Sequence, residues 1–69
     1  MFYFFERDQQ YRRCEIRSNL SGYAIVISEP DGHERVEIFA TSQAAHERWK
    51  SLQDLYHHEG WSGPFGRGE

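Results

Sequence analysis

The stretch Tyr23–Ile27, which reads Tyr-Ala-Ile-Val-Ile, constrains the fold of this chain more than any other segment. Successive side chains of a strand point to opposite faces of a sheet, so such a run is apolar on both faces. The chain offers one long helical stretch, and one helix can cover only one of those faces. The other face needs a different cover: a second copy of the chain, its own Trp61–Phe65 segment, or a ligand.

Short strands joined by polar turns are expected over the first forty residues. The predicted strands are Phe2–Arg7, Tyr11–Ser18, Tyr23–Ser28 and Arg35–Ala40. The predicted connections are the loop Asp8–Gln10 and the turns Asn19–Gly22 and Glu29–Gly32. Connections this short favour consecutive hairpins, because parallel strands need long crossovers. The sequence therefore predicts an antiparallel meander.

One amphipathic helix is expected after the fourth strand. Thr41 or Ser42 can cap it, since either hydroxyl can accept a bond from a first-turn amide. Its apolar residues recur at spacings of three and four, and its charged residues lie on the opposite side. The apolar stripe is Ala45, Trp49, Leu52 and Tyr56, widened by Leu55, and Gly60 is well placed to end the helix.

These elements predict an α+β fold, a four-stranded antiparallel β-meander packed against one C-terminal α-helix (ββββα). The predicted domain spans residues 1–60, and a glycine-rich C-terminal tail spans 61–69. A chain of 69 residues buries only about 60% of the surface that its unfolded form exposes. At roughly 0.05–0.15 kcal/mol per residue, its stability amounts to a few kcal/mol. Association with a second copy would therefore help the fold.

Charge and cysteine content indicate the class of protein. The chain has 8 Lys and Arg against 11 Asp and Glu, so it has no overall attraction for phosphate or an anionic membrane. Its one cysteine, Cys14, cannot form an internal disulfide and is expected to be buried and inert. The opening Met1–Phe5 is too short for a signal peptide's apolar region. We expect a cytoplasmic protein with no membrane span.

No sequence pattern points to catalysis, a metal or a cofactor. His46 and His57 share a helix face but stand about 16 Å apart at about 1.5 Å per residue. No serine lies in a nucleophile-elbow sequence. The segment Gly63–Gly68 lacks the lysine and the flanking strand and helix of a phosphate loop. The chain is therefore expected not to be an enzyme.

The stretch Arg17–Glu29 contains a basic residue, an asparagine, a turn glycine, two apolar strand residues and a closing acid: Arg17, Asn19, Gly22, Ile25, Ile27 and Glu29. This stretch and the predicted helix resemble a PUR-type repeat, the ββββα unit of Pur-alpha-like proteins that bind single-stranded nucleic acids. The likeness covers about residues 15–59, including the helix start Ser42–Ala45 and Trp49. Ser21, Tyr23 and Val26 stand where the family often has basic side chains. The resemblance implies a unit that pairs with a second repeat, so this chain would homodimerise.

A nucleic-acid site, if present, is expected on the sheet face away from the helix. Aromatic rings there could stack bases while arginines meet phosphates. The candidate residues are Tyr11, Arg13, Arg17, Arg35 and Phe39, which Tyr3 or Phe5 with Arg7 could join. The alternative is that the aromatic rings are buried in a dimer interface and the arginines pair with Glu15 and Glu37. Acidic residues of the third hairpin favour this alternative, because they would repel phosphates.

We therefore expect a small non-enzymatic, homodimeric binding module, working as a protein-interaction or regulatory adaptor. The dimer would form through the sheet face that the helix leaves open, or through exchanged helices. The alternative function is binding of single-stranded DNA or RNA on the same open face.

Overall fold

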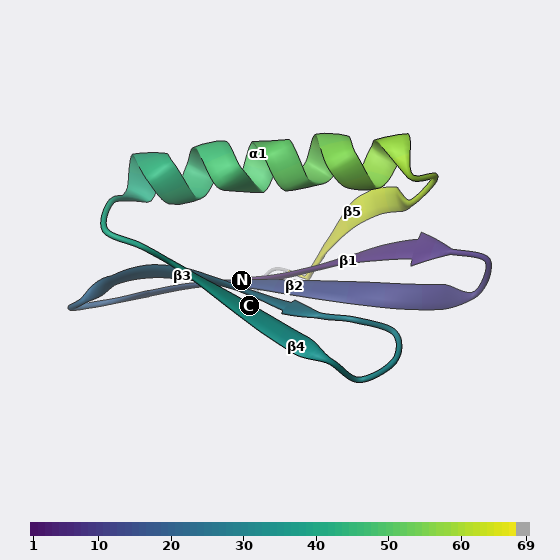
Figure 1. The fold of residues 1–69 in the computed structure, drawn as a ribbon, viewed down its shortest axis with the longest axis horizontal. Coiled ribbons are helices and arrows are strands. Elements are labelled where there is room, and N and C mark those ends of the chain that lie inside the picture. The colour runs from purple at the N-terminus through teal and green to yellow at the C-terminus, as the bar shows by residue number, and fades with distance from the viewer. Residues whose placement is uncertain (68–69) are drawn as a thin grey trace.

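The computed structural model describes residues 1–67 as an antiparallel sheet of five strands with one helix across one face (Figure 1). The strands stand in the order β4-β3-β2-β1-β5. The α+β class and the meander of the first four strands are confirmed. The elements are β1 (Phe2–Arg7), β2 (Gln10–Asn19), β3 (Gly22–Ser28), β4 (Glu34–Phe39), α1 (Ser42–His58) and β5 (Ser62–Arg67).

The fifth strand lies where the sequence predicted a glycine-rich tail. β5 pairs with β1, with Phe65 opposite Phe4, and Trp61 just before it is only 3% exposed. A Cβ at Gly63 would lie 2.9 Å from the Phe4 carbonyl oxygen, so glycine permits this close approach. The segment Trp61–Phe65 thus widens the sheet and does not cover its second face. Positions 68 and 69 of the predicted tail lie outside the described residues.

The turn between β1 and β2 is one residue shorter than predicted. Asp8 and Gln9 have φ angles of 51° and 66°, as expected for the central pair of a two-residue hairpin turn. Arg7 therefore pairs with Gln10, and Tyr3 pairs with Cys14. This register places Tyr3 and Phe5 on the face that α1 covers.

Helix α1 begins and packs as the sequence predicts. The Thr41 hydroxyl accepts a hydrogen bond of 3.1 Å from the Ala44 amide, so Thr41 is the cap. The stripe Ala45, Trp49, Leu52 and Tyr56 is buried. Leu55, by contrast, is 45% exposed and does not widen the buried stripe.

The core occupies the layer between α1 and the sheet. Phe5 is at its centre, with its ring 5.0 Å from that of Tyr56 and 5.9 Å from that of Trp49. No helix in residues 1–67 is long and apolar enough to cross a membrane. The buried cluster comprises Phe5, Cys14, Ile25, Ile27, Trp49, Leu52, Tyr56 and Trp61.

Trp49→Ala is expected to lower the free energy of unfolding by about 3–5 kcal/mol, because it removes a large buried aromatic side chain from contact with Tyr3 and Phe5. Urea unfolding followed by circular dichroism measures the loss. The matched control is Leu55→Ala on the same helix, which should change stability little. Equal losses in the two variants would show that Trp49 does not anchor the helix.

Candidate functional site

The sheet face opposite α1 has no cover in the described part of the chain (Figure 1). We call it the open face. Strand alternation gives its members, because the neighbours of each core residue along a strand point the other way. Its apolar members are Phe2, Phe4, Tyr11, Ala24, Val26, Val36, Ile38 and Phe65.

Four of these residues form an aromatic cluster at the β2-β1-β5 end: Phe2, Phe4, Tyr11 and Phe65. The Phe4 ring lies 5.5 Å from that of Phe65 and 6.1 Å from that of Tyr11. The guanidinium of Arg13 stands 5.8 Å from the Phe2 ring centre. Such spacing is typical of rings and cations that attract one another. Tyr11 is nevertheless 56% exposed, so its ring is available for further contact.

An open groove of about 740 Å³ runs beside the aromatic cluster. Phe2, Phe4 and Tyr11 contribute apolar lining, and Arg13 and Pro30 also line the groove. This volume is within the range of small-ligand sites, but such sites enclose most of their ligand. An open groove of this kind suits a side chain or short segment of a larger partner.

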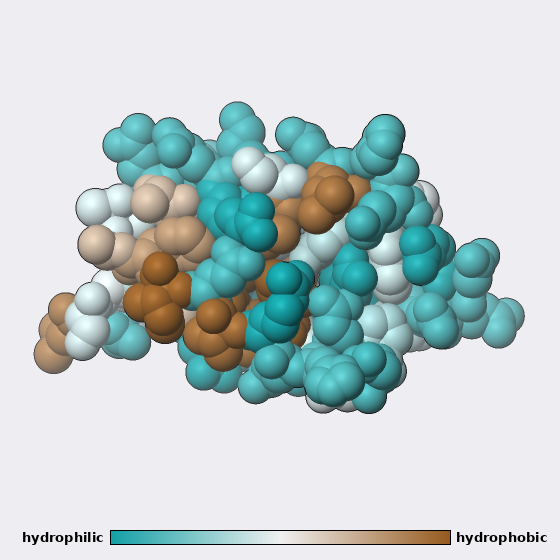
Figure 2. All heavy atoms as spheres, viewed as in Figure 1, coloured by the Kyte–Doolittle hydropathy of each residue, from teal (hydrophilic) through white to brown (hydrophobic). Residues whose placement is uncertain are grey.

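The other four apolar residues form an aliphatic patch on β3 and β4: Ala24, Val26, Val36 and Ile38. Ala24 and Val26 are buried by their neighbours, whereas Val36 and Ile38 are 54% and 73% exposed. Figure 2 shows apolar side chains gathered below the helix in the region of β3 and β4, while the outer side of the helix is hydrophilic. Exposed aliphatic side chains so close together are typical of contact surfaces.

Charged residues of β2 separate the two apolar areas. Arg13, Glu15 and Arg17 all lie on the open face, with charges of alternating sign. Arg17 donates a hydrogen bond of 2.8 Å to Glu15. That bond is the main cause of a lowered pKa of Glu15 and a raised pKa of Arg17. Glu6 and Glu34 also alternate onto this face, so its part on β1 to β4 holds three carboxylates and two guanidiniums. This part of the open face is therefore not a basic surface.

The structure brings together only three of the five candidate nucleic-acid residues. Tyr11, Arg13 and Arg17 lie on the open face as predicted. The prediction is wrong for Arg35 and Phe39, which lie on the face that α1 covers. Phe39 packs against the buried core, and Arg35 makes an ion pair of 3.6 Å with Glu29.

The register of β4 places Arg35 and Phe39 on the covered face. Phe39 pairs with Tyr23 and Arg35 pairs with Ile27, so both lie on the core side of β3. Between them, Glu37 accepts two hydrogen bonds, of 2.8 and 3.1 Å, from Arg48 of the helix. The alternation of β4 is clear in the sequence, but its polar half faces the helix. Arg48 in the predicted helix, as a partner for Glu37, was the sequence signal that the polar side of β4 faces the helix.

Tyr3, Phe5 and Arg7 also lie on the covered face, whereas Phe2, Phe4 and Phe65 were missed as members of the open face. Four consecutive aromatic residues in β1 give no alternation from which to read a face. The two-residue turn Asp8-Gln9 sets the register, and the register fixes which residues of β1 share a face with Cys14.

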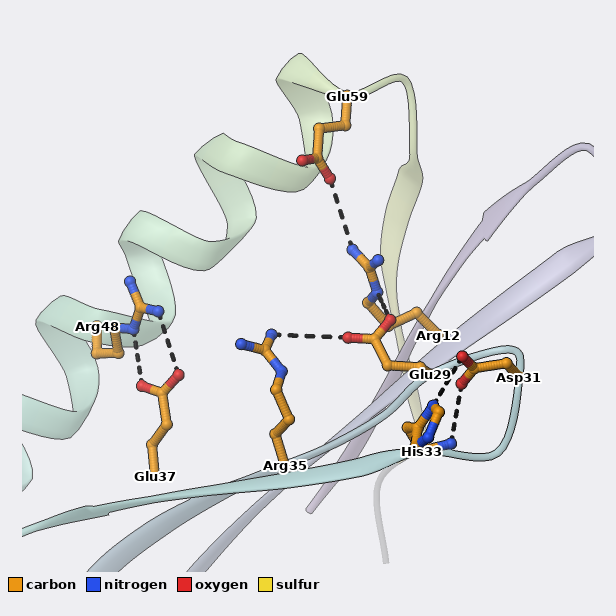
Figure 3. A network of polar contacts seen from close by, with 8 residues as sticks. All are labelled: Arg12, Glu29, Asp31, His33, Arg35, Glu37, Arg48 and Glu59. Atoms are coloured by element: carbon orange, nitrogen blue, oxygen red, sulfur yellow. Dashed lines mark hydrogen bonds and ion pairs between the residues drawn. The ribbon is translucent and has the colours of Figure 1, made fainter.

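A network of hydrogen bonds and ion pairs lies on the helix side of the sheet and links the strands to α1 (Figure 3). Arg12 donates a hydrogen bond of 2.8 Å to Glu29 and lies 3.7 Å from a carboxylate oxygen of Glu59. Its guanidinium also stands 4.3 Å from the Tyr56 ring centre and 4.6 Å from that of Trp61. Arg12 thus ties β2 to both ends of the loop that leads into β5. These groups are paired with one another and belong to the scaffold.

Cys14 is fully buried beneath the helix, as predicted. Burial raises the pKa of its thiol from 9.0 to about 12, with nearby Arg12 opposing the rise. The thiol is therefore protonated and shielded, which is unsuited to a nucleophile. Within residues 1–67, no group of three or more His, Cys, Asp and Glu side chains is placed to hold a metal ion.

Comparisons with protein-family models, with curated proteins and with solved structures found no match to this chain.

Native Cys14 is expected to react with Ellman's reagent at pH 8 on the order of a thousandfold more slowly than the thiol of the urea-unfolded chain. A pKa of about 12 against 9.0 leaves far less thiolate, and burial adds a steric barrier. Because the folded pKa is the higher, the thiol's contribution to stability is complete below pH 9 and is lost as the pH rises toward 12. Equal rates in folded and unfolded protein would contradict this assignment.

Proposed function

We propose that this chain is a small non-enzymatic, homodimeric binding module whose open face contacts a partner protein. The observation that carries the proposal is the pair of apolar areas on a sheet face without a cover in residues 1–67. Aromatic anchors beside a groove are the usual energetic centre of a protein interface. The aromatic cluster with its groove is the part of the open face that best fits an inserted apolar side chain.

The charges of the open face favour a protein over a nucleic acid. On β1 to β4, three carboxylates share the face with two guanidiniums, and one of these, Arg17, is hydrogen-bonded to Glu15. Of the two open-face arginines of β2, Arg13 is left as the cation beside the aromatic cluster. A phosphate backbone needs several such cations along its path. The resemblance to a PUR-type repeat, with the single-strand binding that it implies, stays a prediction.

The partner contact is tested with peptides selected from a random phage-displayed library on the immobilised full chain. Peptides with aromatic or long aliphatic side chains should be enriched, since these fit the groove beside Phe2, Phe4 and Tyr11. Tyr11→Ser should weaken binding of the selected peptides by about tenfold or more, as is typical of a central aromatic anchor. Isothermal titration with a synthetic peptide measures the change.

The matched control is Leu20→Ser, which removes a fully exposed apolar side chain at the β2-β3 turn, away from the groove. It should leave peptide affinity unchanged. Equal losses in the two variants would refute the groove as the contact site. Micromolar binding of a labelled oligo-dT strand that falls with salt and is lost in Arg13→Ala would replace the protein partner with nucleic acid.

Sedimentation equilibrium of the wild-type chain tests the homodimer. We expect a monomer–dimer equilibrium at micromolar concentration, because a domain of this size with exposed Val36 and Ile38 gains stability by burying them. Monomer alone at several hundred micromolar would contradict it.

A further inference from the structure

β4 is an edge strand of the sheet, and its edge is open to pairing. It runs from Glu34 to Phe39 without proline or glycine, which are the residues that usually interrupt an edge. The opposite edge strand, β5, contains Gly63, Pro64 and Gly66, and its register with β1 shifts between Phe4 and Glu6. The two edges therefore differ, and β4 is the one suited to receive another strand.

The free backbone groups of β4 can be assigned from one hydrogen bond. The Glu29 amide donates a hydrogen bond of 2.7 Å to the His33 carbonyl, so the backbone amide and carbonyl of His33 point toward the β3 side. Antiparallel pairs alternate between bonded and non-bonded, so Arg35, Glu37 and Phe39 bond to β3 as well. The amides and carbonyls of the intervening residues, Glu34, Val36 and Ile38, therefore point away from the sheet.

These three outward residues restrict how two copies of β4 can pair about a two-fold axis. Only the register with Val36 opposite Val36 matches all three with one another, since Glu34 then meets Ile38 of the second copy. In that register Arg35 stands opposite Glu37 of the second copy, twice. Shifting the axis to Arg35 or to Glu37 would place like charges opposite each other, which destabilises a strand pair.

We propose that two copies of this chain join through β4 in the register centred on Val36, forming one continuous ten-stranded sheet. The inference rests on the proposed homodimer and specifies its geometry. Opposite charges at Arg35 and Glu37 and three matched backbone positions make the edge complementary to itself. This geometry differs from the dimer through the open face or exchanged helices expected from the sequence, and it leaves the aromatic cluster free for a partner.

The surroundings of β4 suit this contact on both faces of the sheet. On the helix side, Arg35 is held near Glu29 and Glu37 near Arg48, so charges of alternating sign would continue from one copy into the next (Figure 3). The Arg35 side chain is 53% exposed, which leaves it able to reach a second carboxylate. On the open face, the two aliphatic patches would meet at Val36 and Ile38.

Charge reversal at the edge tests the inference in the full chain. Arg35→Glu and Glu37→Arg should each weaken the dimer by about tenfold or more in sedimentation equilibrium, because each places like charges opposite at two positions. An equimolar mixture of the two variants should form a heterodimer tighter than either homodimer, since every opposed pair is then attractive. Loss of the intrachain pairs with Glu29 and Arg48 cannot produce that rescue, because mixing does not restore them.

Two further variants complete the test. Val36→Pro removes an outward amide at the two-fold axis and should give a monomer, with circular dichroism confirming that the chain is folded. Lys50→Glu reverses an exposed charge on α1 and should leave the dimer unchanged. A wild-type dimer that Arg35→Glu, Glu37→Arg and Val36→Pro all leave intact would overturn the edge contact and keep the homodimer. A monomeric wild type would overturn both.

Discussion

Packing of the single helix on one face of the sheet is the constraint on which the rest of this structure depends. The stripe Trp49, Leu52 and Tyr56 buries Phe5 and the core side of β3, and it leaves the second apolar side of β3 without a helix. The sheet twists beneath α1 and extends beyond it (Figure 1). The open face and the unpaired backbone edge of β4 are therefore the parts of the sheet that the helix leaves uncovered.

Arg12 and Arg48 on the covered side fix the position of the helix on the sheet through ion pairs with glutamates. Arg12 contacts the rings of Tyr56 and Trp61 and pairs with Glu29, so it links the end of α1 and the start of β5 to β2. Arg48 binds Glu37 and thereby sets which side of β4 faces the helix. Because Arg12 and Arg48 are used in the scaffold, they do not contribute positive charge to the open face, and the case for a nucleic-acid surface weakens accordingly.

Most of the fold could be predicted from local patterns. Three local patterns each predict one element that the structure contains. They are the alternation of β2, which predicts a strand, the turn residues Asn19–Gly22, which predict a hairpin, and the spacing from Ala45 to Tyr56, which predicts a helix. The fifth strand could not be predicted, since Ser62–Arg67 contains two glycines and a proline and has little intrinsic strand preference. Trp61, buried against Arg12, directs that segment back to β1.

The sequence by itself determined that a strand apolar on both sides, Tyr23–Ile27, would meet only one helix, so that one face would lack a helical cover. It also determined the burial of Cys14 and of the helix stripe, because those follow from residues close together in the chain. Only the tertiary structure decided which sides of β1 and β4 form that face. In β1 both sides are aromatic, and the turn that follows it sets the register. In β4 the side that faces the core is set by contacts with a helix that comes after it in the chain.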